Sequence, residues 1–536
     1  MKKLFLLLTL LLSFHSAWGQ PVEVNGIWYF LHDTNQIMTA TVTDQTYADG
    51  SWSRKKYVGD LVIPSTITVD GTEYTVTKIV DECFARESNL TSVTLPNTIT
   101  ALPTRAFYDC TGLKSVTLSN TLTKIGYYCF KGCTSLTSIT LPESLTEFSE
   151  GSFQDCSGLR AITIPNSVTS ISFSCFSSCT SLASVTLPNS VTSLEAYSFS
   201  HCTSLTTISL PNSITSMEYY CFLNCTGLTS VTLPNAITSM SECFYGCSSL
   251  TSIILPETVT NLNGCFQYCS SLTSIHIPAS VKSMAGCFKD CSSLTSVNLP
   301  NSVEDIDGCF SGCVSLSSIV IPESVTSLGQ STFEGCENLS SITIPNSVTS
   351  LGWGCFKDCT SLNHLTLPNS ITEIAWMCFA YSSLSSITLP NAITSLPVNC
   401  FLNCKYLSTI TIPASVTSLG DWCFSGTGLT SIEMLPPTPP TTSEDIFVSI
   451  ELFKGAPLKT IYVVDENAKA LYEASMPWNR YTIVAMASGI EEAQHEKDAP
   501  RITDRYNLSG KKLDGKHSGP VIMRYADGST QKIMMK

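Results

Sequence analysis

One periodic residue constrains the fold of this chain: sixteen phenylalanines follow one another at intervals of 22 or 23 residues. They are Phe84, Phe107, Phe130, Phe153, Phe176, Phe199, Phe222, Phe244, Phe266, Phe288, Phe310, Phe333, Phe356, Phe379, Phe401 and Phe424. A fixed period in this range predicts a solenoid, in which each repeat is one coil stacked on the coil before it. A single coil cannot bury its own apolar side, so we expect one core that grows along one axis.

The residues of one coil, 136–159, show how it is built. Leu136, Ile139 and Leu141 are spaced so that their side chains point inward along a strand, with polar residues between them. Pro142 then ends the strand because proline has no backbone N–H to give to a sheet. We therefore expect a parallel β-sheet on one face and short turns, 3-10 or helical segments on the other.

The repeated pattern L-T-S-I-T-L-P-x-S-V-T-S-I/L, followed by C-F-x-x-C-x-x-L, covers about residues 80–435. It resembles the BspA-like leucine-rich repeats of bacterial surface proteins. It departs from other leucine-rich repeats because proline and an exposed residue such as Asn166 or Glu143 replace the inward asparagine. It departs from its own family in having Cys where Ala is common. The resemblance implies a right-handed leucine-rich repeat horseshoe that lies outside the cell and serves adhesion or partner binding.

The two ends of the repeat array differ from its middle. Asp70–Gly71 suits the tight turn of a β-hairpin before the first coil. After Ser431, a proline-rich break leads to a strand at Leu458–Val464 and a short helix that Asp465 caps. We expect Trp478, Tyr481 and Ile483 to cover the last coil. The predicted units are a signal peptide at 1–19, an N-terminal β-hairpin cap at 20–78, the solenoid at 79–435, a small α/β capping unit at 436–486, a linker at 487–500 and a sorting-like β segment at 501–536.

The first residues have the pattern of an export signal. Lys2 and Lys3 precede the apolar run Leu4–Leu12, and the small residues Ala17 and Gly19 fit a cleavage site. A membrane anchor is the alternative, but the run is shorter than the roughly 20 apolar residues that a transmembrane helix needs. We therefore expect no transmembrane span, and a secreted protein or one held at the cell surface.

The tail carries a second resemblance. Tyr506–Lys512 and Lys532–Lys536 are similar to the end of the C-terminal sorting domains of Bacteroidetes proteins exported by type IX secretion. The alternative is a small β-meander that ends the chain.

The chain contains 25 cysteines, many of them in C-x-x-x-C pairs. Disulfides or metal ligands are two interpretations, and small buried apolar residues are the third. The first position of the pair is also filled by Ala106, Ser152, Ser198 and Thr332, which indicates a limit on size and not a need for a ligand. We expect most thiols to be buried and reduced.

No motif indicates catalysis. The seven histidines form no H-E-x-x-H, and the chain has no G-x-S-x-G, no phosphate-binding loop and no dinucleotide fingerprint. The net charge of −14 argues against nucleic acid, which needs clustered Lys and Arg. We therefore expect no enzyme, no cofactor, no metal site and no nucleic-acid partner.

Two sets of residues are candidates for a binding surface. In four successive coils the outward strand position, elsewhere nearly always Ser or Thr, becomes Ile254, His276, Asn298 and Val320. Five aromatic residues lie three positions before a periodic phenylalanine: Tyr127, Phe173, Tyr219, Trp353 and Trp376. Neutral drift is the alternative for the first set, and a structural role at the corner of the coil is the alternative for the second.

The function that these observations favour is an adhesin or recognition scaffold for host protein, glycan or another microbe. The alternative is a structural protein of the envelope without a discrete ligand. An array assay separates the two, because only an adhesin should retain specific molecules. The oligomeric state is left open.

Overall fold

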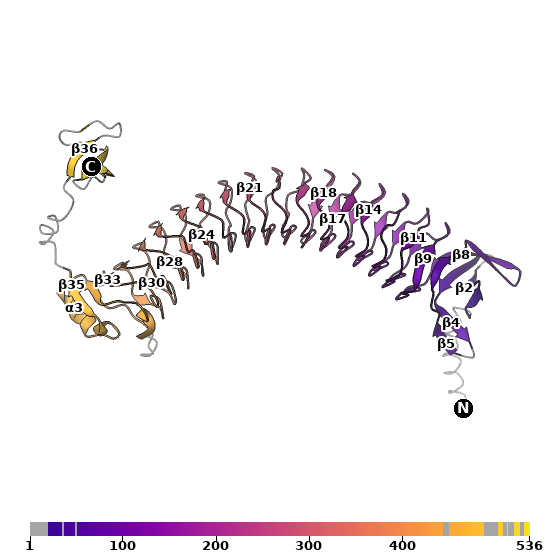
Figure 1. The fold of residues 1–536 in the computed structure, drawn as a ribbon, viewed down its shortest axis with the longest axis horizontal. Helices are drawn as coiled ribbons and strands as arrows, with labels where there is room; N and C mark the ends of the chain where they lie inside the picture. Colours follow the sequence, from indigo (N-terminus) through magenta and orange to yellow (C-terminus); the bar gives the residue numbers. More distant parts are fainter. Residues whose placement is uncertain are drawn as a thin grey trace, which may run out of the picture.

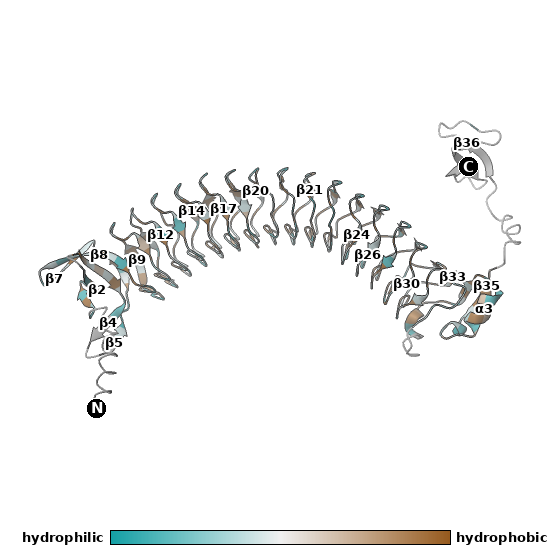
Figure 2. Cartoon of the chain, turned by 180° about the vertical axis from the view of Figure 1, so that it is seen from behind, coloured by the Kyte–Doolittle hydropathy of each residue, from teal (hydrophilic) through white to brown (hydrophobic). Residues whose placement is uncertain are grey.

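The computed structural model describes residues 20–34, 37–48, 51–442, 450–486, 502–506, 512, 519–525 and 530–535. The stacked coils form a long arch (Figure 1). Figure 2 shows the arch from behind, with a sheet at its N-terminal end and α3 at the other. The predicted signal peptide, the predicted linker and most of the segment Tyr506–Lys512 lie outside the described residues.

Each coil contributes up to two short strands and one turn segment. The turn segment surrounds the periodic phenylalanine, as residues 219–224 surround Phe222. Figure 1 shows one set of strands near the outer edge of the arch, and we call them the outer strands. They are β9 (Leu90–Thr94), β11 (Ser115–Thr117), β14 (Ala161–Thr163), β16 (Ser184–Thr186), β18 (Thr207–Ser209), β20 (Ser230–Thr232), β21 (Ser274–His276), β22 (Ser296–Asn298), β23 (Ser318–Val320), β25 (Ser341–Thr343), β27 (His364–Thr366), β29 (Ser386–Thr388), β31 (Thr411–Ile412) and β33 (Ser431–Met434).

The second set consists of two-residue strands, which we call the flank strands. They are β10 (Ala101–Leu102), β12 (Lys124–Ile125), β13 (Glu147–Phe148), β15 (Ser170–Ile171), β17 (Ser193–Leu194), β19 (Ser216–Met217), β24 (Ser327–Leu328), β26 (Ser350–Leu351), β28 (Glu373–Ile374), β30 (Ser395–Leu396) and β32 (Ser418–Leu419). All pairings between coils are parallel, as the sequence predicts.

The periodic phenylalanines form one stacked column through the core. Neighbouring rings lie 5.1–6.0 Å apart between centroids and are tilted by 3–26°. The column has one ring more than the period predicts, because Phe453 stacks on Phe424 at 5.5 Å. An insertion before Phe453 widens its spacing and hides it from the pattern. Tyr57 closes the first end, and Trp478 and Tyr481 close the other end as expected.

A continuous ladder of backbone hydrogen bonds accompanies this column. The amide of each periodic phenylalanine donates to the carbonyl of the residue just before the next ring, at 2.8–3.0 Å between nitrogen and oxygen. Sixteen such bonds follow one another. The first joins Phe84 to Ala106, and the last joins Phe424 to Leu452. The outer strands, in contrast, form separate sheets of two to four strands. Stacked parallel strands form hydrogen bonds at a spacing of about 4.7–4.9 Å. In a curved stack the coils lie closer together on the inner edge than on the outer edge, so only one edge can keep this spacing throughout. The unbroken ladder marks the edge where the coils are closest. The turn segments therefore form the inner edge of the arch.

The broken outer sheet corrects one expectation. Leu136, Ile139 and Leu141 are buried as predicted. The strand expected there is absent, because this coil lies at a break between the sheet of β11 and the sheet of β14. The inward pattern identifies the core residues correctly but does not guarantee hydrogen bonds along a curved edge.

The cysteines lie inside the stack. All 25 are buried and free, so none forms a disulfide. Thirteen of them follow a periodic phenylalanine by three residues, and each donates its S–H to the carbonyl of the phenylalanine one coil earlier, at 2.8–3.3 Å between sulfur and oxygen. Cysteine at this position is therefore a weak hydrogen-bond donor as well as a small buried residue.

The N-terminal cap is mainly one five-stranded sheet in the order β1-β2-β3-β8-β7. The expected hairpin forms at Asp70–Gly71, where both residues have positive φ. The strands of this region are β1 (Val22–Val24), β2 (Ile27–Thr34), β3 (Ile37–Thr43), β4 (Gln45–Ala48), β5 (Ser51–Arg54), β6 (Gly59–Val62), β7 (Thr66–Val69) and β8 (Thr72–Ile79).

At the other end, β34 (Thr460–Val463) and β35 (Thr482–Ala485) extend the sheet of β31 and β33. Helix α3 (Glu466–Glu473) follows β34, and the Asp465 carboxylate caps it by accepting from the amide of Ala468 at 2.8 Å. Short 3-10 turns lie at Ile450–Phe453 and Trp478–Arg480. In the tail, β36 (Ile502–Tyr506), β37 (Gly519–Tyr525) and β38 (Thr530–Met535) form an antiparallel sheet.

We predict that Phe266→Ala destabilises the protein by about 3–5 kcal/mol, because it removes a fully buried ring and leaves a cavity between two stacked rings. Ile254→Ala is the matched control in the same coil, because Ile254 is 88% exposed and should cost less than about 0.5 kcal/mol. Urea unfolding measures both values. Equal costs for the two variants would contradict a core built on the ring column.

We also predict that the protein loses stability as pH rises above about 9. Burial raises the pKa of the Cys110, Cys225, Cys269 and Cys404 thiols from 9.0 to about 12. Above pH 9 the unfolded chain releases these protons and the folded chain does not, so each such thiol removes up to about 1.4 kcal/mol per pH unit. Urea midpoints between pH 7 and 10 measure the loss, and iodoacetamide should label the thiols only after unfolding. A flat profile, or disulfides detected by mass, would contradict this prediction.

Candidate binding surfaces on the solenoid

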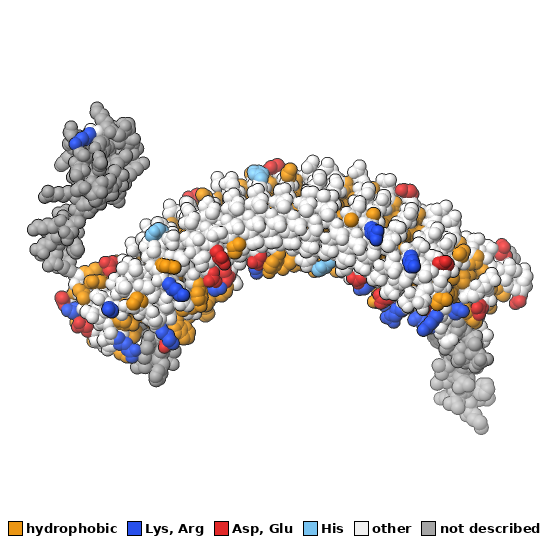
Figure 3. Space-filling view, viewed as in Figure 1, with side chains coloured by type: hydrophobic (Ala, Val, Ile, Leu, Met, Phe, Trp, Pro, Cys, Tyr) orange, Lys and Arg blue, Asp and Glu red, His pale blue; other side chains and the backbone are white. Residues whose placement is uncertain are grey.

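The turn segments place side chains on the inner edge in a regular way. The residues two before and two after a periodic phenylalanine have positive φ, as Tyr220 (60°) and Asn224 (53°) do around Phe222. These two left-handed residues tighten the turn while the phenylalanine between them points into the core. The residue just before the phenylalanine is also buried, as Cys221 is, whereas Tyr219, three residues before it, is exposed. Figure 3 shows that hydrophobic and charged side chains gather along the inner edge and at both ends of the arch.

Six aromatic residues from five successive coils form a connected row on these turn segments. Their ring centroids lie 5.1–5.9 Å apart from one neighbour to the next. We call this set the tyrosine row: Phe173, Tyr197, Tyr219, Tyr220, Tyr245 and Tyr268. Tyr219 is 49% exposed and Tyr268 is 41% exposed, and the other four residues are partly buried. The row is therefore an aromatic surface and not a part of the core.

Three residues of the row occupy left-handed backbone positions: Tyr197 (φ 59°), Tyr220 (φ 60°) and Tyr268 (φ 60°). A residue with a Cβ costs about 1–2 kcal/mol in this conformation, and glycine avoids the cost. Glycine occupies the same kind of position in other coils, two residues before their phenylalanine, at Gly151, Gly286, Gly308 and Gly354. The tyrosines thus stand where glycine would be favoured, and the gain from burying them is small. Elsewhere the same positions also carry other non-glycine residues, such as Arg105, His201 and Asp290, so this conformation belongs to the coil in general.

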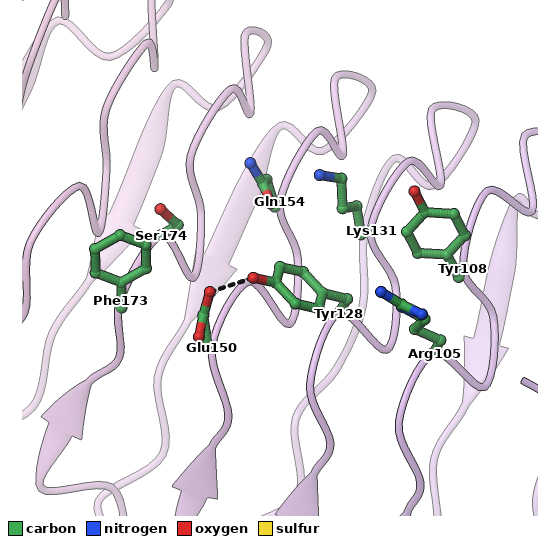
Figure 4. A pocket seen from close by; sticks show the side chains of 8 residues that line it. All are labelled: Arg105, Tyr108, Tyr128, Lys131, Glu150, Gln154, Phe173 and Ser174. Atoms are coloured by element: carbon green, nitrogen blue, oxygen red, sulfur yellow. Dashed lines mark hydrogen bonds between the residues drawn. The ribbon is translucent and has the colours of Figure 1, made fainter. Parts of the chain in front are cut away.

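A cavity of about 360 Å³ lies at the N-terminal end of the row (Figure 4). It is lined by Arg105, Tyr108, Tyr128, Lys131, Glu150, Gln154, Phe173 and Ser174. The Arg105 guanidinium lies 5.5 Å from the ring of Tyr108 and 5.9 Å from the ring of Tyr128, and the Lys131 ammonium lies 5.5 Å from the Tyr128 ring. Cations held over aromatic faces in this way are attracted by the ring quadrupole.

The charges of this cavity are already paired. Arg105 bonds to Glu82 at 3.0 Å, and Lys131 lies 3.6 Å from Asp155. Tyr128 donates its hydroxyl to Glu150, and this bond, together with burial, raises the pKa of Tyr128 to about 12. The cavity therefore presents neutral phenols, an amide and compensated ion pairs to a ligand.

The predicted outward residues lie along the outer strands, on a different part of the coil from the tyrosine row. Ile254 is 88% exposed and Val320 is 65% exposed. His276 and Asn298 are direct neighbours on β21 and β22, but Val320 on β23 belongs to the next sheet. Ile254 lies at a break in the outer sheet, beside a cavity of about 610 Å³ that Val231, Leu233 and Pro256 also line. The four residues thus lie at the same outward position of successive coils, and β22 and β23 remain in contact although they belong to different sheets.

The structure brings together only part of the predicted aromatic set. Phe173 and Tyr219 both belong to the tyrosine row, where Tyr197 connects them. Tyr127 is 51% exposed and Trp376 is 62% exposed, and neither has a ring contact with the row.

Trp353, also from the predicted set, is partly buried beside a separate cavity of about 370 Å³. Lys289, Asp307 and Glu334 line the same cavity, and Glu334 bonds to Lys357 at 2.5 Å.

Sequence reasoning missed four members of the row: Tyr197, Tyr220, Tyr245 and Tyr268. They lie at other positions around the periodic phenylalanine: two before it, one after it or two after it. A search for aromatic residues at every position of the turn segment would have found them.

Among the residues that the structure describes, no three or more His, Cys, Asp or Glu side chains are grouped so that they could hold a metal ion. No helix within the described ranges has the length and apolar character needed to cross a membrane.

Comparisons with known proteins agree with this architecture. The family described as the BspA type leucine rich repeat region matches residues 77–202, 169–286, 263–375 and 328–454. A leucine-rich repeat protein from Bacteroides ovatus is similar over 87% of this chain and 100% of its own, with 22% identity and a TM-score of 0.54. A leucine rich cell surface protein from Faecalibacterium prausnitzii is 30% identical over 67% of this chain and 95% of its own, with a TM-score of 0.46. No curated protein matches the sequence.

The backbone of the row generates a prediction about stability. Tyr220→Gly should be more stable than Tyr220→Ala by about 1 kcal/mol, because alanine keeps the left-handed strain and glycine removes it. Tyr219, one residue earlier and without positive φ, is the matched control. There the order should reverse, with alanine more stable than glycine by about 0.5–1 kcal/mol. Urea midpoints of the four variants measure both differences. The same order at both positions would contradict the strain at Tyr220.

Proposed function

Because the chain belongs to the BspA type leucine-rich repeat family, we propose that it is an exported recognition scaffold that binds macromolecules outside the cell and catalyses no reaction. Leucine-rich repeats of this type are typically non-catalytic scaffolds that mediate interactions between proteins. Its partners are host protein, glycan or the surface of another microbe, and binding makes it an adhesin. The signal-like segment 1–19 supports export, and the tail resembling a sorting domain supports a place at the cell surface.

The observation that carries the proposal is the inner edge of the arch. One backbone ladder holds every turn segment in register, so the surface side chains of many coils keep fixed positions relative to one another. A surface arranged before binding loses little conformational entropy when a ligand is bound. Exposed aromatic residues on this edge supply large and rigid contact area.

A binding screen tests the proposal. The chain from residue 20 to 536, immobilised, should retain specific host matrix proteins, glycans or microbial cells in a saturable way, and a denatured sample should not. A strain without the protein should lose attachment while its envelope remains intact. An absence of any specific binding, combined with a weakened envelope in that strain, would contradict the proposal and favour a structural protein of the envelope.

A further inference from the structure

The charge around the tyrosine row restricts what it can bind. No lysine or arginine occurs between Arg160 and Lys282, and this stretch contains the whole row. Its acidic residues are Glu195, Glu218, Glu242 and Glu257. Along this stretch an anionic ligand, such as a nucleic acid or a sulfated or uronic acid polymer, would meet no lysine or arginine. The nearest cations flank the two ends of the row, at Arg105 and Lys131 beside Phe173 and at Lys289, whose carbonyl accepts from the amide of Tyr268.

Two of the acidic side chains are already used within the solenoid. Glu195 accepts a hydrogen bond from the amide of Phe173 at 2.9 Å, and Glu218 accepts one from the amide of Ala196 at 3.1 Å. Burial and the neighbouring Glu242 raise the pKa of Tyr220 to about 12, so its hydroxyl remains a neutral donor at physiological pH. The row therefore presents partly exposed aromatic rings and phenol groups, and the charged side chains of this stretch are all carboxylates.

This chemistry favours one class of ligand. Protein interfaces draw much of their affinity from arginine as well as from aromatic residues, and no arginine occurs in residues 161–281, which carry the row. A pyranose ring has one face of C–H bonds, which suits the electron-rich face of an aromatic ring, and a rim of hydroxyl groups, which suits phenols, Ser and Asn. An uncharged sugar chain can use both features at once.

We propose that the tyrosine row binds an uncharged polysaccharide that lies along the axis of the solenoid. This inference rests on the proposed role as a recognition scaffold and specifies the ligand of one of its surfaces. The row crosses five coils, so successive sugar units meet successive rings. It has defined ends: Phe173 borders the cavity of Arg105 and Lys131, and in the two coils beyond Tyr268 the left-handed positions carry no aromatic residue. They are Gly286, Asp290, Gly308 and Gly312.

Three residues of the row can be replaced without adding strain to the backbone. Tyr197, Tyr220 and Tyr268 occupy positions where glycine costs less, and their rings remain partly exposed. Replacing them by glycine should therefore remove the binding surface without unfolding the coils. This separation of binding from stability makes the inference testable.

The test uses affinity gel electrophoresis of the chain 20–536 with neutral polysaccharides (mannan, dextran, xyloglucan and laminarin) and anionic ones (heparin and polygalacturonate). At least one neutral polymer should retard the protein, and the anionic ones should not. The triple variant Tyr197→Gly, Tyr220→Gly, Tyr268→Gly should bind about tenfold more weakly or worse. Retardation should hardly change when salt is raised, because no charges are involved.

The matched control is the double variant Tyr381→Gly, Trp422→Gly. It makes the same kind of change at left-handed positions (φ 61° and 51°) in coils outside the row. It should bind as tightly as the unchanged chain, within about twofold. The urea midpoints of both variants confirm that the solenoid is folded.

Three results would overturn the inference. They are an absence of binding to every neutral polymer, tighter binding to the anionic polymers, and undiminished binding by the triple variant. If the triple variant instead loses a protein ligand that the unchanged chain binds, the row has a protein partner and the polysaccharide assignment is wrong. The role as a recognition scaffold would survive each of these results, because it fails only if the chain binds no macromolecule at all.

Discussion

The whole arch depends on the stacking of one phenylalanine per coil and on the amide of that phenylalanine. The ring fills the centre of the coil, and the amide bonds to the next coil at 2.8–3.0 Å, so the same residue supplies the apolar contact and the hydrogen bond. Neither alone would be sufficient, because a column without the ladder could slip and a ladder without the column would enclose a void. Cysteine S–H groups add a second, weaker set of links between coils, to the carbonyls of the phenylalanines themselves.

The inner ladder also determines how the surface is divided. Because the turn segments keep close contact, the outer edge is stretched, and its sheet separates into short pieces. The outer face consequently shows mostly Ser and Thr on short strands, with an apolar groove where Ile254 lies at a break. The inner edge carries the aromatic rings, in fixed register from coil to coil. A binding surface on this edge is held by the most regular part of the molecule.

Much of this could be predicted from the sequence because the period is strict. The inward residues, the hairpin at Asp70–Gly71 and the cap at Asp465 follow from local chemistry that hardly depends on the rest of the fold. Phe453 was missed because an insertion shifts it out of the period, although its ring completes the column. The tyrosine row was missed for a different reason. Its members lie at several positions of the turn, and only the three-dimensional path of the turn brings Tyr197, Tyr220 and Tyr245 together.

Hydrogen exchange resolved to single amides tests the central claim most directly, because it compares the two edges of the same coils. The amides of the periodic phenylalanines should be among the slowest to exchange along the whole array, and the amides of the outer strands next to sheet breaks, such as that of Ile254, should exchange much faster. Slower exchange on the outer strands than in the turn segments would show that the outer sheet holds the arch together, and would contradict this account.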